Sequence, residues 1–190
     1  MKKRFFTSLQ LLACILFVLP CCSVYGSKDD PFPAGSQLPR STFPAPDSQE
    51  TLSYLGLTAM EPYTISQIGA KLVLIEVLKV WCPVCRENAP VMNRLYQVVQ
   101  NDADLARDVK IIGICTENNK KQADAFRKNF KVAFPLIPDE HYGIGLTVKV
   151  SHTPTMVLVT SSGKVLWSHI GEISDFDGLL RELRENLKKL

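Results

Sequence analysis

A Cys-x-x-Cys motif lies at the junction of two strongly patterned segments, and this junction constrains the fold more than any other feature of the sequence. The motif reads Trp81-Cys82-Pro83-Val84-Cys85. Residues 72–81 form an almost unbroken apolar run, which predicts a buried strand. Residues 84–100 predict an amphipathic helix. The apolar positions of that helix are Val91, Met92, Leu95, Val98 and Val99.

The two cysteines can close a small disulfide ring and open it again. Cys82 lies at the predicted helix N-terminus, where unpaired backbone N–H groups and the helix dipole stabilise a thiolate. Pro83 occupies the first helical position, where its missing N–H costs nothing. This placement predicts a thiol–disulfide oxidoreductase, in which Cys82 attacks a client disulfide and Cys85 resolves the mixed disulfide. The alternative is a structural bridge, although so tight a loop constrains little of the unfolded chain.

The first 26 residues have the pattern of a targeting segment. A basic stretch at residues 2–4 precedes an apolar run at residues 11–19, and Val24 and Gly26 supply small residues for a cleavage site. A membrane span needs roughly 20 apolar residues, so a cleaved export signal is the first interpretation. An uncleaved N-terminal anchor and a lipid anchor are the alternatives. The candidate lipidated residues are Cys14, Cys21 and Cys22.

The net positive charge of the chain comes from this targeting segment. The formal net charge is +3, and Lys2, Lys3 and Arg4 are the charged residues of positions 1–26. The remainder is neutral and shows no basic stripe interleaved with aromatics, so we expect no nucleic-acid partner. Export also implies an oxidising compartment.

Residues 27–48 are rich in proline, and we expect them to form an extended or mobile linker. The alternative is an N-terminal arm lying on the domain. The proline positions are Pro31, Pro33, Pro39, Pro44 and Pro46.

Residues 49–190 are predicted to form one α/β domain around a central mixed β-sheet flanked by helices. Strands are expected at 109–115, 133–137, 155–160 and 164–170, the last two forming a hairpin. Helices are expected at 118–131, beginning after a cap at Thr116, and near the C-terminus, capped by Ser174. Weaker patterns predict a strand or turn at 52–57 and helical or turn segments at 64–68 and 141–148.

The chain resembles the thioredoxin superfamily, and within it the exported TlpA/ResA-type oxidoreductases with redoxin or AhpC/TSA-like domains. Besides the cysteine motif, the resemblance rests on Pro90 in the redox helix, Thr153-Pro154 before a strand, Gly171 after the last strand, and Glu76. It covers about residues 50–190. It implies a thioredoxin-like fold with an extra helix–strand insert, which residues 118–137 supply.

Two positions depart from the group's pattern. Many of its members have proline as the second residue between the cysteines, whereas here Pro83 comes first and Val84 second. Cytochrome-maturation thioredoxins of the CcmG type also place proline first. The group often carries an acid six residues after the first cysteine, where this chain has Asn88.

Further site residues are assigned through this resemblance. It implies that Pro154 is cis and faces the cysteine pair with Thr153 as its companion; an ordinary trans proline is the alternative. Trp81 is expected to shield one side of the disulfide, or else to be a core aromatic. Glu76 interrupts a buried strand, where it could relay the proton of Cys85, or else point into a water-filled notch.

Two more residues have competing interpretations. His152 could tune Cys82, or could be an ordinary strand-end side chain. Cys115 ends an apolar strand and is expected to be a buried unpaired thiol, with a regulatory thiol as the alternative.

The sequence therefore predicts an exported enzyme that exchanges disulfides with protein clients, as a reductant supplied by an upstream redox donor, with apocytochrome c as one possible client. The alternatives are a disulfide-forming oxidant, a thiol peroxidase, and a non-enzymatic copper- or protein-binding module. A peroxidase of the peroxiredoxin type has threonine three residues before its cysteine, where this chain has Lys79. We expect no cofactor, no metal and a monomer in the periplasm or on the extracytoplasmic face of the membrane, with membrane association only through the N-terminus.

Overall fold

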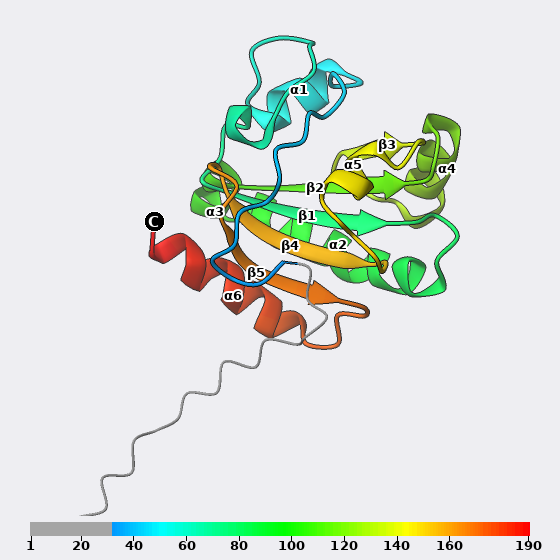
Figure 1. Ribbon diagram of the computed structural model, residues 1–190. Helices are drawn as coiled ribbons and strands as arrows, with labels where there is room; N and C mark the ends of the chain where they lie inside the picture. Colours follow the sequence, from blue (N-terminus) through cyan, green and yellow to red (C-terminus); the bar gives the residue numbers. More distant parts are fainter. Residues whose placement is uncertain (1–31) are drawn as a thin grey trace, which may run out of the picture.

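The fold is built on a five-stranded mixed sheet with strand order β3-β2-β1-β4-β5 (Figure 1). The computed structural model describes residues 32–190. The central strand β1 pairs in parallel with β2 and antiparallel with β4, while β3 and β5 lie at the edges. The strands are β1 (Leu72–Leu78), β2 (Val109–Thr116), β3 (Leu136–Asp139), β4 (Thr155–Thr160) and β5 (Val165–Ile170). This arrangement confirms the predicted thioredoxin-like α/β class.

The helices cover both faces of the sheet (Figure 1). They are α1 (Gln49–Leu55), the 3-10 turn η1 (Ile65–Gln67), α2 (Pro83–Asn101), α3 (Ala103–Asp108), α4 (Lys120–Phe130), α5 (Gly143–Thr147) and α6 (Phe176–Lys188). The unit α4–β3 is the predicted helix–strand insert. Among residues 32–190, no helix is both long and apolar enough to cross a membrane.

Alternate residues of β1 enter two separate cores, because successive side chains of a strand point to opposite faces. Leu74 and Leu78 join a core with Met92 of α2, Phe126 of α4 and Leu183 of α6. On the other face, the odd-numbered residues of β1 pack against the chain that precedes α1 and against α5. Helix α2, which begins at the cysteine pair, packs on the face that carries Leu74 and Leu78.

The described part of the Pro-rich segment, residues 32–48, is packed on the domain rather than extended as a mobile spacer. Phe32, Leu38 and Phe43 are buried. Its backbone hydrogen-bonds to β5 and to the β4–β5 turn; the Gly35 N–H, for instance, donates to the Val165 carbonyl at 2.8 Å. These residues therefore lie as an arm on the domain, because apolar side chains between the prolines bury against the sheet. The predicted signal or anchor, residues 1–26, lies outside the described residues.

Several local predictions need correction. Residues 49–55 form helix α1, because Ser48 caps its first turn and Gly56, with a φ of 65°, ends it. The expected strand or turn at 52–57 is therefore wrong. Helix α3 was not predicted. The strand at 72–81 stops at Leu78, where a turn begins that joins the Cys82 N–H to the Lys79 carbonyl.

The predicted helix caps are also displaced. Thr116 continues β2 and pairs with Asp139 of β3, so the cap of α4 is Asn119, whose side chain accepts from the Gln122 N–H. Helix α6 is capped by Asp175 rather than Ser174. In addition, β3 begins at Leu136 instead of residue 133.

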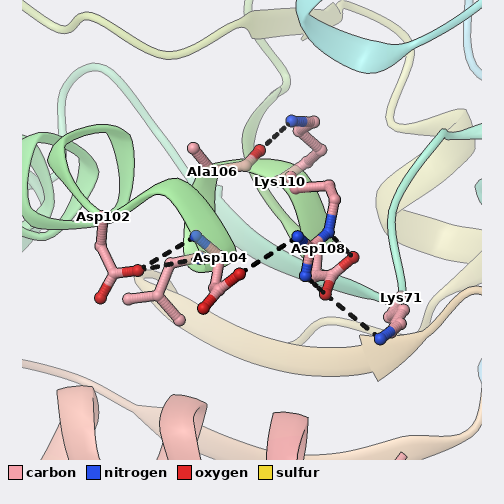
Figure 2. A network of polar contacts seen from close by, with 8 residues as sticks. Lys71, Asp102, Asp104, Ala106, Asp108 and Lys110 are labelled. Atoms are coloured by element: carbon pink, nitrogen blue, oxygen red, sulfur yellow. Dashed lines mark hydrogen bonds and ion pairs between the residues drawn. The ribbon is translucent and has the colours of Figure 1, made fainter.

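A cluster of charges fixes the end of the sheet where β1 and β2 begin (Figure 2). Asp108 contacts Lys71 at 3.2 Å and Arg107 at 2.8 Å. The Lys71 N–H donates to the Asp108 carbonyl at 2.9 Å, which ties the residues preceding the two strands to each other. This cluster sets the register at one end of the strands, and the cysteine motif follows the other end of β1.

Candidate active site

Cys82 caps helix α2, as the sequence predicts. Its Sγ accepts a hydrogen bond from the Cys85 N–H at 3.4 Å, and Pro83 begins the helix. A sulfur at this position takes the place of the side-chain oxygen of an ordinary N-cap and meets the positive end of the helix dipole. Pro90 lies inside the same helix. The geometry therefore stabilises the thiolate of Cys82 relative to that of an ordinary cysteine.

The two cysteines differ in exposure and in acidity. Burial acts to raise the pKa of Cys82, but hydrogen bonds from the Cys85 side chain and backbone outweigh it and lower that pKa. Cys85 is fully buried, and burial followed by its hydrogen bond to Cys82 raises its pKa far above the ordinary range. Both cysteines are free thiols. One sulfur can thus attack from the surface while the other is held protonated behind it.

The loop before β4 faces Cys82. The Thr153–Pro154 bond is cis, as the resemblance implies. The Cys82 thiol donates to the Thr153 carbonyl at 3.3 Å, so the predicted pair Thr153-Pro154 lies beside Cys82. The carbonyl of Pro154 accepts from the Gly171 N–H at 2.9 Å, which brings the loop after β5 to the same place.

Trp81 lies on the surface next to Cys82 in the chain, with 66% of its area exposed, so the interpretation as a core aromatic is wrong. The guanidinium of Arg86 lies 5.9 Å from the centre of its ring. Arg86 also donates from its Nε to the Val80 carbonyl at 3.0 Å, which fixes the loop that carries Trp81. The indole thus presents an exposed apolar surface next to Cys82.

Glu76 lies in the middle of β1 and is 2% exposed. Burial raises its pKa from 4.5 to about 8. Within the part of the chain that the structure describes, its Oε1 has no hydrogen-bond partner. Its place in the strand puts it on the same sheet face as Leu74 and Leu78, which pack in one core with Cys85. A buried carboxyl that can be neutral near pH 7 is chemically suited to hold or release a proton.

Cys115 is a buried free thiol at the end of β2, as expected. Burial, reinforced by the negative charge of Glu76, raises its pKa to about 12. Such a thiol is a poor nucleophile. His152 is exposed, and its Nδ1 lies 2.9 Å from the Ser151 hydroxyl.

Three residues hold the site together without having been predicted to do so. Asn118 accepts the Val80 N–H at 2.9 Å, and Glu117 forms a 2.6 Å ion pair with Lys79. Asn88 links α2 to the loop after β5. The sequence signalled Asn88 only as a departure from a family pattern, and no local spacing marks the other two. Within residues 32–190, no three His, Cys, Asp or Glu residues gather as metal ligands would.

Comparison with known proteins agrees with this geometry. The family model described as Redoxin matches residues 28–183. The chain belongs to the Redoxin family.

The sequence identity to individual relatives is low. A thiol-disulfide oxidoreductase ResA of Bacillus cereus is 28% identical over 108 residues, which are 57% of this chain and 60% of that protein. The thioredoxin-like protein YneN of Bacillus subtilis is 28% identical over 114 residues, 60% of this chain and 65% of YneN. The matches thus span less than two thirds of these relatives. The crystal structure of StoA from Bacillus subtilis superposes with a TM-score of 0.56 and 19% identity, over 75% of this chain and 96% of StoA, and supports the fold.

Proposed function

We propose that this protein is a thiol–disulfide oxidoreductase that acts on protein disulfides through Cys82 and Cys85. The observation that carries the proposal is the contrast between the two sulfurs. Cys82 is partly exposed, has a lowered pKa and caps α2, whereas Cys85 is fully buried and has a raised pKa. A nucleophile and a protected resolving thiol, one helical turn apart, are what two-step disulfide exchange requires.

The reaction balances without a cofactor. The Cys82 thiolate attacks one sulfur of the client disulfide, a Cys82–client bond forms, and the other client sulfur leaves as a thiolate that takes up a proton. Cys85 then loses its proton and attacks Cys82 Sγ, which releases the second client thiol. The client gains two electrons and two protons, and the protein is left with a Cys82–Cys85 disulfide. An upstream dithiol must return that disulfide to the reduced form.

Glu76 is the proposed acceptor for the proton of Cys85. The Cys85 thiol is the group that must ionise in the second step, and its burial opposes ionisation. Glu76 lies on the same sheet face, and one of its oxygens is free of partners in residues 32–190. With a pKa of about 8, the fraction of Glu76 that is ionised near neutral pH can take that proton inside the core. Trp81 and the Thr153-Pro154 loop would contact the client beside Cys82.

The clients are proposed to be proteins outside the cytoplasm, and the protein is proposed to act there as a monomeric reductant. The pattern of residues 1–26 supports export, and the similarity to ResA supports membership in a group of thiol-disulfide oxidoreductases. Pro83 and Val84 offer the Cys82 thiolate no side-chain donor, which disfavours an extreme oxidant. A client in cytochrome c maturation is consistent with the resemblance.

Equilibration of the protein with glutathione buffers tests the direction of electron flow. Related Cys-x-x-Cys proteins span roughly −270 to −120 mV. A reductant is expected near the lower value, and the reduced protein should then reduce insulin. A potential near the upper value would instead support the disulfide-forming alternative. A reduced protein that does not reduce insulin, and whose dithiol does not equilibrate with glutathione, would contradict the proposal.

A further inference from the structure

We propose that Asn88 is a positioning residue that holds the two loops beside Cys82 in the arrangement that a client disulfide meets. The inference rests on the proposed function, because it assigns a role within disulfide exchange. Asn88 lies on α2, six residues after Cys82 and thus about 9 Å farther along the helix axis. It therefore acts through other residues rather than on the sulfur itself.

Asn88 binds one loop through both the nitrogen and the oxygen of its side-chain amide. Its Nδ2 donates to the Gly171 carbonyl at 3.2 Å, and its Oδ1 accepts the Ile173 N–H at 3.0 Å. The residue is 0% exposed. Loss of the second bond would leave the buried N–H of Ile173 without its partner, which costs more than the net gain from an ordinary hydrogen bond. The loop after β5 is therefore tied to the redox helix.

The loop that Asn88 holds is itself bonded to the cis-proline loop. The Gly171 N–H donates to the Pro154 carbonyl at 2.9 Å, and the neighbouring Thr153 carbonyl accepts from the Cys82 thiol at 3.3 Å. Gly171 has a φ of 96°, a conformation that favours glycine, while the space around its Cα is open. Glycine is thus required for the backbone path and not for lack of room.

These contacts form a closed circuit that starts and ends on α2. It runs from Cys82 to the Thr153-Pro154 loop, from there to Gly171, and back to the helix at Asn88. Because the circuit is closed, release of the Asn88 link frees the loop after β5 and loosens its bond to Pro154. The sulfur keeps its helix cap, since that hydrogen bond comes from the Cys85 N–H.

An amide suits this position better than the acid found in many relatives of the group. The loop presents one carbonyl and one N–H, so the side chain must donate and accept at once. A carboxylate only accepts. It would also add a negative charge to the helix that carries the Cys82 thiolate. Asn88 instead satisfies both backbone groups and stays neutral.

The test is Asn88→Asp, which keeps the acceptor and loses the donor, together with Asn88→Ala, which adds no charge. Asn93→Asp is the matched control, because Asn93 lies on the same helix and donates from Nδ2 to the Phe130 carbonyl at 2.8 Å, in contact with α4 rather than the site. The reduced proteins are reacted with insulin over a range of concentrations and with hydroxyethyl disulfide. Hydrogen exchange of the Gly171 N–H is followed by NMR.

Both Asn88 variants should raise the KM for insulin about tenfold, while the rate with hydroxyethyl disulfide stays within about twofold of the parent. Exchange of the Gly171 N–H should be about tenfold faster. Asn93→Asp should leave all three values near those of the parent. A KM for insulin equal to the parent's, or a parent-like Gly171 exchange rate in both Asn88 variants, would overturn the proposal. If the parent itself reduces neither disulfide, the proposed function fails, and the Gly171 exchange rate still decides whether Asn88 holds the loop.

Discussion

The thiol of Cys82 lies 3.3 Å from the carbonyl oxygen of Thr153, although 71 positions separate the two residues in the chain. The sheet brings them together, because β1 leads into the cysteine motif and pairs antiparallel with β4, with Val77 opposite Thr155. The N-terminus of α2 and the cis-proline loop therefore meet at one end of the sheet. The proposed chemistry depends on this meeting point.

The two cysteines should have separable roles. Cys82→Ser should abolish insulin reduction, because the remaining thiol of Cys85 is buried and has a strongly raised pKa. Cys85→Ser should still attack but should accumulate a mixed disulfide with the client. Intact-mass measurement under non-reducing conditions detects that adduct. A Cys82→Ser protein that reduces insulin at the parent's rate would refute the assignment.

Glu76→Gln should slow the resolution of the mixed disulfide several-fold, because the variant can no longer accept the proton of Cys85. Stopped-flow measurement of release from a Cys82–client adduct checks this. Glu185→Gln is the control, since Glu185 is an exposed residue of α6. The proton role of Glu76 is excluded if both variants resolve the adduct as fast as the parent.

Glu76 should also make stability depend on pH. Its pKa is about 8 in the folded protein against an ordinary value of 4.5, so the folded state keeps a proton that the unfolded state loses. The free energy of unfolding should therefore fall as pH rises from about 4.5 to about 8, and level off above that. Urea denaturation of Glu76→Gln should lack this fall and show a more stable protein at about pH 8. Parallel curves for parent and variant across this range would contradict the burial of a titrating acid.

Asp108 should make the stability depend on pH in the opposite direction to Glu76. Its hydrogen bond with Arg107, aided by Lys71, lowers its pKa from 3.8 to about 2 against the effect of burial. The contribution of Asp108 to the free energy of unfolding is therefore complete above about pH 4 and is lost as pH falls toward about 2. Asp108→Asn should lower the melting temperature at neutral pH and should match the parent near pH 2. Asp104→Asn, at a more exposed partner of Arg107, should change the melting temperature less.

Much of the site could be predicted from the sequence because its signals are local. An apolar run followed by Cys-Pro-x-Cys and a helical pattern places Cys82 at a helix cap without knowledge of the rest of the chain. The position of the cis proline was available only through a family resemblance. Asn88 shows what local reasoning misses, since its partners Gly171 and Ile173 lie 83 and 85 positions away.

The errors in the fold have equally physical origins. Thr116 has the chemistry of a helix cap, but its pairing with Asp139 in the sheet extends β2 and moves the cap to Asn119. The Pro-rich composition of residues 27–48 concealed apolar side chains such as Phe43, which is fully buried. A proline-rich composition indicates a segment without regular secondary structure. It does not indicate which of the side chains between the prolines are buried in the core.

The most direct test is the pH dependence of alkylation of the reduced native protein by iodoacetamide, with the modified cysteines identified by mass spectrometry. The account predicts that Cys82 reacts first, with a midpoint below that of a free thiol, about 8.5, while Cys85 and Cys115 stay protected until the protein unfolds. A midpoint for Cys82 at or above the free-thiol value, or equal reactivity of all three cysteines, would contradict it.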